Sequence, residues 1–292
     1  MRITRVAAVA AVAALALGLT ACGGDDGGEG TGAGSKSFAA GSTMEKLNKA
    51  QKIKVGTKFD QPGFGLKGLS GKPEGFDVEI AKIIVKELGI PEDKIEWVEA
   101  PSKVREDVIV NGTVDLVAAT YTINDKRKER IAFAGPYYEA GQNILVKKDD
   151  TTITGPDSFK DGTKKVCSVT GSTPAETIKQ YVKDVGTQLV LFDTYDKCRD
   201  ALKGGQVNAV TTDNVILLGY IAKDEASFKL AGSNFTKEPY GIGVKKEDAD
   251  FRSFINDTLD KAVADGSWKK AWDETAGKFG AELGSAPTIN RY

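Results

Sequence analysis

The stretch GFDVEIAKIIVKELGIPEDKIEWVEA, residues 75–100, indicates the fold class that we expect for this chain. Apolar side chains recur in its first half at the spacing of one helix face, and Gly89 stands where such a helix ends. A predicted strand follows this helix at once, and another predicted strand, KIKVGTKF at 52–59, precedes it. Strands that alternate with helices favour parallel βαβ units over a β-sandwich.

The same alternation begins again further along the chain. After a predicted strand at 141–148, three segments each combine a strand with a helix: 164–182, 187–205 and 207–222. We therefore expect two α/β units, with the chain passing between them near 139–148 and again near 237–245, and with the C-terminal helices returning to the first unit. Ligands of such sheets bind beyond the carboxyl ends of the strands, which here places them in the cleft between the units.

Composition excludes several kinds of function. The chain has 292 residues with a formal net charge of -1, so an overall electrostatic attraction to nucleic acid is not expected. It contains no histidine, which removes Ser-His-Asp and Cys-His catalysis and the commonest metal ligand. Three cysteines without a CxxC spacing are too few for a zinc site built of cysteines alone. We expect no catalytic residue, no metal and no cofactor.

The N-terminal segment has the pattern of an export signal. Two arginines precede an apolar run at 6–19, which is shorter than the roughly 20 residues of a membrane span. The sequence Leu-Thr-Ala-Cys that ends at Cys22 resembles a bacterial lipobox, in which the cysteine becomes the lipid-modified first residue. The alternative is a plain secretory signal with an incidental cysteine. Gly-rich, polar residues follow Cys22 and read as a flexible tether. We predict a lipid-anchored protein on the outer face of the cell membrane.

Three polar loops lie at predicted strand ends. The loop before 174 includes Thr173, which we predict to be the N-cap of a helix, with Pro174 and Glu176 completing a capping box and free N–H groups making a small anion site. Asp213 follows a strand, where its carboxylate can receive an ammonium group or cap the next helix. Arg127 follows a third strand, and its planar guanidinium can donate two parallel hydrogen bonds to a carboxylate. The neighbouring cations, Lys126, Lys128 and Arg130, are expected to be solvated.

Four segments, at 75–84, 114–138, 166–176 and 207–213, together closely resemble the polar amino acid substrate-binding proteins of ABC importers. The resemblance covers residues 53–279 in the same order. It implies a two-lobed periplasmic-binding-protein-like II fold of the α/β class, in which each lobe is a mostly parallel sheet flanked by helices and the ligand lies in the interlobe cleft.

The resemblance also implies residue roles. Arg127 corresponds to the arginine that holds the ligand α-carboxylate, and Asp213 to the aspartate that receives the α-amino group. Lys58 and Arg105 stand where the acidic amino acid branch places contacts to the side-chain carboxylate, although the charges in the segment 102–112 leave open whether Lys103 or Arg105 faces the cleft. The complete predicted ligand-binding set is Lys58, Phe59, Ser102, Arg105, Thr120, Tyr121, Thr122, Arg127, Thr170, Gly171, Ser172, Thr173 and Asp213.

The predicted organisation has six parts. They are a signal peptide at 1–21, a tether at 22–44, lobe 1 at 45–140, lobe 2 with flanking hinge strands at 141–240, the rest of lobe 1 at 241–280 and a tail at 281–292. Cys167 and Cys198 both fall in lobe 2. Since disulfides persist outside the cytoplasm, we expect these two cysteines to be bridged, the alternative being two buried thiols.

The expected function is the capture of an acidic amino acid, with glutamate favoured, and its delivery to a membrane permease. Glutamine, aspartate or another polar amino acid is the alternative ligand. Two alternatives belong to other classes: an enzyme of the cyclohexadienyl dehydratase kind on the same fold, and a sensor that would need a separate partner. A monomer that shifts between open and closed states is expected.

Overall fold

The computed structural model describes residues 36–292. The predicted signal peptide, the lipidation residue Cys22 and most of the predicted tether therefore lie outside the described residues. Within 36–292, none of the helices is both long and apolar enough to span a membrane.

Residues 36–292 form two five-stranded sheets, and the first of them contains the strand β1. Its order is β5 (Ile95–Glu99), β1 (Ile53–Thr57), β6 (Leu116–Val117), β13 (Glu238–Lys245) and β7 (Ile131–Ala140). The strand β1 pairs in parallel with β5 and β6, whereas β13 runs antiparallel to both of its neighbours. Four of the five strands thus share one direction.

The second sheet repeats this arrangement. Its order is β10 (Leu189–Phe192), β9 (Val166–Val169), β11 (Ala209–Asp213), β8 (Gln142–Lys147) and β12 (Phe228–Leu230). Here β9 pairs in parallel with β10 and β11, and β8 is the antiparallel strand. We call each sheet with its packed helices a lobe, lobe 1 and lobe 2. The predicted two-lobed α/β fold with mostly parallel sheets is confirmed.

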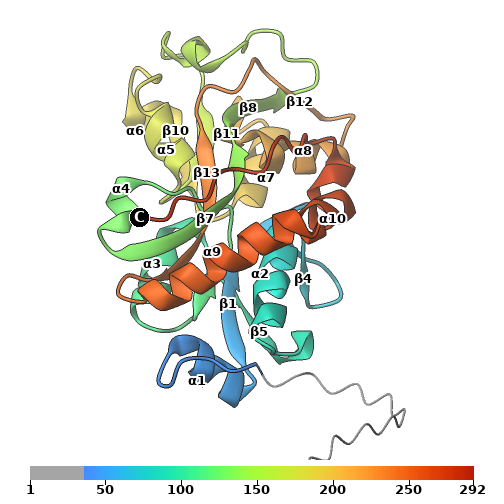
Figure 1. Cartoon of the computed structure of the whole chain (residues 1–292). Coiled ribbons are helices and arrows are strands. Elements are labelled where there is room, and N and C mark those ends of the chain that lie inside the picture. Colours follow the sequence, from blue (N-terminus) through green and yellow to red (C-terminus); the bar gives the residue numbers. More distant parts are fainter. Residues whose placement is uncertain (1–35) are drawn as a thin grey trace, which may run out of the picture. The chain divides into compact units, whose positions relative to one another are not determined.

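Two strands connect the lobes. The strand β7 of lobe 1 leads within two residues into β8 of lobe 2, and the chain returns from β12 to β13. Figure 1 shows these crossings in the middle of the described chain. Since β7 and β13 also pair with each other, the crossing point is a two-stranded hinge.

The helices cover the sheets with apolar faces. The predicted helix is α2 (Phe76–Glu87), which buries Phe76, Ile80 and Ile84 completely. The C-terminal helices α9 (Ala249–Ala264) and α10 (Ser267–Glu274) return to lobe 1, where Trp268 Nε1 donates to the Tyr137 carbonyl at 2.8 Å. The other helices are α1 (Thr43–Ala50), α3 (Arg105–Val110), α4 (Asp125–Lys128), α5 (Thr173–Ile178), α6 (Val185–Gln188), α7 (Tyr195–Lys203) and α8 (Asn214–Lys223), and a small sheet joins β2 (Asp60–Gln61), β3 (Gly65–Lys67) and β4 (Pro73–Glu74).

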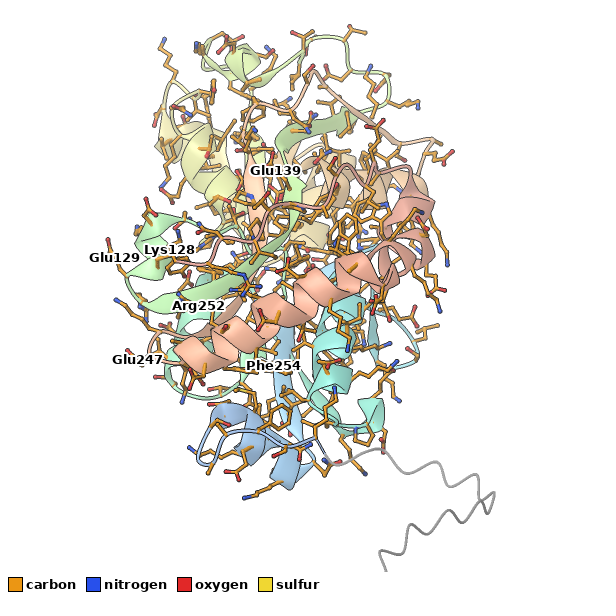
Figure 2. The ribbon with its side chains drawn as sticks, in the orientation of Figure 1. Lys128, Glu129, Glu139, Glu247, Arg252 and Phe254 are labelled. Atoms are coloured by element: carbon orange, nitrogen blue, oxygen red, sulfur yellow. A yellow bond between two sulfur atoms is a disulfide. The ribbon has the colours of Figure 1, made fainter. Side chains whose placement is uncertain are left out.

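The C-terminal residues pack along the hinge strand β7. The backbone N–H of Asn290 donates to the Gly135 carbonyl at 2.8 Å, and the N–H of Phe133 donates to the Tyr292 hydroxyl at 2.8 Å. Lys128 and Arg252, labelled in Figure 2, both contact the Tyr292 ring. The Lys128 Nζ lies 4.6 Å and the Arg252 Cζ 4.3 Å from the ring centroid. The predicted tail is thus ordered against lobe 1.

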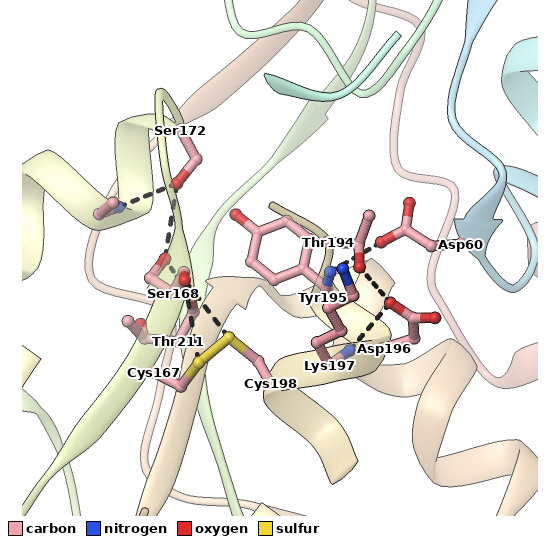
Figure 3. Close-up of a disulfide and its surroundings, with 11 residues drawn as sticks. Asp60, Cys167, Ser168, Ser172, Thr194, Tyr195, Asp196, Lys197, Cys198 and Thr211 are labelled. Atoms are coloured by element: carbon pink, nitrogen blue, oxygen red, sulfur yellow. Dashed lines mark hydrogen bonds between the residues drawn. A yellow bond between two sulfur atoms is a disulfide. The ribbon is translucent and has the colours of Figure 1, made fainter. Parts of the chain in front are cut away.

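A disulfide joins Cys167 on β9 to Cys198 on α7, which confirms the predicted bridge. Figure 3 shows it beside Ser168, whose hydroxyl donates to the Thr211 carbonyl at 2.9 Å. Both cysteines are fully buried. The bond fixes the start of α7 to the sheet of lobe 2, and this start also carries Tyr195.

Removing the disulfide should lower the stability of the protein. The bridged residues are 31 positions apart, and on the chain-entropy model a loop of this length contributes about 3–4 kcal/mol. We expect the double variant Cys167→Ala, Cys198→Ala to lose this amount in the free energy of unfolding, measured by urea denaturation. An unchanged denaturation midpoint would contradict the estimate.

Candidate functional site

Two adjoining cavities lie where the lobes meet, and both lobes line each of them. The inner cavity has a volume of about 10 Å³, which is room for about one water molecule, and the outer cavity has a volume of about 490 Å³. Ser102 of lobe 1 and Ser172 and Thr173 of lobe 2 line both. The inner cavity is completed by Arg105, Thr120, Thr122, Pro174, Tyr195, Thr212, Asp213 and Ile216.

Asp213 is the acidic group of the inner cavity. It ends β11 and precedes α8, yet its side chain makes no capping hydrogen bond. The carboxylate oxygen Oδ2 accepts a hydrogen bond from the Tyr240 hydroxyl, while Oδ1 is buried and has no partner within the described residues. Burial and then the nearby charge of Glu238 raise the pKa of Asp213 to about 8. An arriving ammonium group would give Oδ1 a partner and favour the ionised form.

Thr120 is held in an unusual backbone conformation at the rim of this cavity. Its φ is 44°, in the left-handed region that residues with a side chain rarely adopt. The Asp77 carboxylate accepts from the Thr120 N–H at 2.7 Å, and the Thr120 hydroxyl donates to the side-chain carbonyl of Gln61 at 3.0 Å. Strain of this kind persists where surrounding contacts impose it, typically at binding sites. Thr120 is one of the residues that line the inner cavity.

Two guanidinium groups contact the ring of Tyr121. The Arg105 Cζ lies 4.0 Å and the Arg127 Cζ 5.0 Å from the ring centroid. Arg105 is 2% exposed and its Nη1 donates to the carbonyls of Ala119 and Thr120, so this arginine faces inward. Lys103 instead lines only the outer cavity. The fully buried ring of Tyr121 thus contacts both cations.

Arg127 connects the lobes directly. Its Nη1 donates to the Thr122 carbonyl of lobe 1 at 2.6 Å, and its Nη2 to the Gly171 carbonyl of lobe 2 at 3.1 Å. The Nε atom lies 3.2 Å from a carboxylate oxygen of Glu106. Burial and the neighbouring Arg105 lower the pKa of Arg127 to about 10, so the guanidinium stays charged at neutral pH. Its neighbours Lys126 and Arg130 are exposed, and Lys128 is half-buried.

Lys58 is a buried cation without a carboxylate contact in the described chain. Its ammonium group donates to the Ser102 hydroxyl at 2.7 Å, and the residue is 3% exposed. Burial and the charges of Arg105 and Arg127 lower the pKa of Lys58 to about 7. Since Ser102 lines both cavities, the ammonium lies one hydroxyl group away from them. An anion placed there would stabilise its charged form.

The start of α5 differs from the prediction. Ser172, and not Thr173, is the N-cap, because its hydroxyl accepts from the Ala175 N–H at 3.1 Å. Thr173 is the first helical residue, and its hydroxyl turns toward lobe 1. Gly171 has a φ of 80°, and a Cβ there would lie 2.7 Å from Lys103 Cα, so only glycine allows the two lobes to approach this closely.

The structure brings most of the predicted residues together. Nine of the thirteen predicted residues line one or both cavities. Lys58 and Tyr121 lie directly behind the lining, where they contact Ser102 and Arg105. The other two are outside the site: Phe59 packs under Lys67, and Thr170 is exposed. The sequence reading missed Tyr195, Thr212 and Glu238. Tyr195 follows β10 and Thr212 is the last residue but one of β11, so the rule on strand ends could have found them, whereas no sequence signal marks Glu238. In the described part of the chain, no group of Cys, Asp and Glu residues is arranged to hold a metal.

Comparison with known proteins agrees with this geometry. A family model described as bacterial extracellular solute-binding proteins, family 3, matches residues 53–277. The glutamate-binding protein GluB of Corynebacterium efficiens is 40% identical over 285 residues, which cover 94% of this chain and 92% of that protein. A glutamine-binding protein of Geobacillus stearothermophilus is 40% identical over 229 residues, 78% of this chain and 86% of that protein. The solved structure of an ancestral arginine-binding protein bound to glutamine has a TM-score of 0.71 at 35% identity, covering 77% of this chain and 97% of that one.

Proposed function

Since this chain belongs to the bacterial extracellular solute-binding proteins of family 3, we propose that it captures L-glutamate outside the cell and delivers it to the membrane permease of an ABC importer. The protein acts by binding alone, and no chemical step is assigned to it. The two sheets move as lobes about the strands β7 and β13, and they close over the ligand. The similarity to the glutamate-binding GluB supports this choice of ligand.

The observation that carries the choice is the charge of the cleft. Lys58, Arg105 and Arg127 are all at least nine-tenths buried. Arg105 and Arg127 line the cavities, and Lys58 donates to Ser102, which lines both. A ligand with two carboxylates and one ammonium group matches three cations and Asp213. Arg127 would hold the α-carboxylate, Asp213 the α-amino group, and Lys58 with Arg105 the side-chain carboxylate. A buried cation gains most when an anion contacts it directly.

Isothermal titration calorimetry against the common amino acids tests the proposal. We expect glutamate to bind most tightly, with aspartate and glutamine weaker and arginine not binding. Tighter binding of glutamine or of a cationic amino acid would refute glutamate as the ligand, but it would still support a site for an amino acid. The similarity to a glutamine-binding protein makes glutamine the ligand to compare most carefully.

The pH dependence of selectivity offers a second test. In the free protein the pKa of Lys58 is about 7, and a bound carboxylate should raise it. Below about pH 7 the ammonium is charged before binding, so this group adds no pH dependence. Above about pH 7 binding must take up a proton, and the affinity for glutamate should fall by up to about tenfold per pH unit. The titration of Asp213 should change the affinities for glutamate and glutamine equally, because both ligands carry the same α-amino group. The ratio of the two affinities therefore reports the titration of Lys58 alone. A ratio that stays constant between about pH 6 and pH 9 would contradict the role of Lys58.

We further propose that Cys22 anchors the protein to the membrane through a lipid. The supporting pattern is the apolar run at 6–19 followed by Leu-Thr-Ala-Cys. We expect Cys22→Ala to release the protein from the membrane fraction or to leave it unprocessed, as measured by fractionation and intact mass. A variant of mature size that stays with the membranes would disprove the anchor.

A further inference from the structure

The carboxylate of Glu238 contacts hydroxyl groups of both lobes. Glu238 begins β13 in the hinge and is 3% exposed. Its Oε2 accepts from the hydroxyl of Thr122 in lobe 1 at 2.7 Å and from the hydroxyl of Thr173 in lobe 2 at 2.7 Å. The two hydroxyl oxygens are 3.2 Å apart. One carboxylate oxygen therefore joins the lobes at the wall of the inner cavity, which both threonines line.

Hydroxyl groups balance this buried charge. The other oxygen of Glu238, Oε1, accepts from Thr236 at 2.8 Å. The two nearby cations are already paired, Arg127 with Glu106 and Lys237 with Glu139. Within the described residues, Glu238 thus has three hydroxyl donors and no ion pair. A buried carboxylate needs such donors, so opening the cleft would remove at least one that it cannot easily replace.

The same two hydroxyls are predicted contacts of the ligand. A threonine hydroxyl has one proton to donate, so it cannot serve Glu238 and a ligand carboxylate at the same time. We propose that Glu238 takes the place of a ligand carboxylate when the cleft is empty: it holds Thr122 and Thr173 together, keeps a fraction of the protein closed without ligand, and releases the two hydroxyls when a ligand binds. Glu238 is then a positioning residue that sets the closing equilibrium, and through it the affinity.

The test measures this equilibrium without any ligand. Fluorophores on cysteines at Lys94 and Lys160, exposed residues of lobe 1 and lobe 2, would report the distance between the lobes in the full chain carrying Cys22→Ser. We expect the ligand-free wild type to show a closed population. Glu238→Gln removes the charge at nearly constant size, and should lower the closed-to-open ratio by about tenfold or more. Thr173→Val, which removes the donor from lobe 2, should act in the same direction and add little to Glu238→Gln.

Glu139→Gln is the matched control. Glu139, labelled in Figure 2, lies on β7 in the same hinge and is exposed. It pairs with Lys237 and has no hydrogen bond to either threonine within the described residues. It should leave the distance distribution unchanged. Equal ligand-free distributions in wild type and Glu238→Gln, with both variants folded by thermal unfolding, would overturn the proposal. The roles of Thr122 and Thr173 toward the ligand rest on the proposed function, but the ligand-free measurement does not: if glutamate fails to bind, the test of Glu238 still stands.

Discussion

Arg127→Met should abolish the binding of glutamate and glutamine alike. In the structure the guanidinium donates to carbonyls of both lobes, and in the proposed complex it holds the α-carboxylate that all amino acids share. Its removal would leave a buried ligand carboxylate without its principal partner, at a cost of about 3–5 kcal/mol. The dissociation constant should therefore rise by at least several hundredfold, measured by calorimetry at a temperature where the variant is folded.

Two variants make this result specific. Lys128→Met changes a half-buried cation on the same short helix that lines neither cavity, and it should leave the affinity within about twofold, since partly solvated charges contribute little. Arg127→Lys keeps the charge but loses the planar fork, and should recover only part of the affinity. Binding by Arg127→Met within about threefold of wild type would reject the assigned role.

The second large effect concerns selectivity. Glutamate and glutamine have nearly the same shape, so charge must separate them. A side-chain carboxylate beside Lys58 and Arg105 gains charge-assisted hydrogen bonds worth about 1.5–3 kcal/mol each, and glutamine would leave these cations without an anion. After allowance for water left in the site, we expect glutamate to bind roughly a hundredfold to a thousandfold more tightly.

Lys58→Met should reduce this preference to about tenfold and change glutamine binding little. Lys58 suits the experiment better than Arg105, because within residues 36–292 its ammonium has only the Ser102 hydroxyl as a hydrogen-bond partner. Arg105 also donates to the carbonyls of Ala119 and Thr120, so its loss would disturb the backbone as well. The exposed Lys67, which lies over Phe59, is the control. If Lys58→Met kept the full preference for glutamate over glutamine, the ligand side-chain carboxylate would not contact Lys58.

Local patterns predicted much of the fold. The apolar spacing in α2, the strand-helix alternation and the pair of lobes follow from residues that are neighbours in sequence. The pattern predicts the N-cap of α5 one residue late, because Ser172 and Thr173 are adjacent hydroxyl residues and both can cap a helix. The conformation of Thr120 could not be foreseen, since it depends on Asp77, which is 43 positions away.

The candidate site likewise contains residues that local sequence patterns predict and residues that only long-range contacts identify. Asp213 and Arg127 stand at predicted strand ends, so sequence reasoning reached them. Glu238 did not stand out, because its importance comes from hydroxyl groups 116 and 65 positions away in the chain. The hydrogen bond from Lys58 to Ser102, which lines the inner cavity, likewise joins segments that are 44 positions apart in the sequence.

The repeated strand order of the two sheets has a consequence for affinity. The loops after β1 and β6 in lobe 1 occupy the same places in their sheet as the loops after β9 and β11 in lobe 2. The protein therefore resembles a bivalent receptor, in which two weak half-sites are tethered by the strands β7 and β13. In such a receptor the second half-site acts at an effective concentration that its linker determines. Substitutions in these two strands can change the affinity by altering that concentration, even where they touch no atom of the ligand.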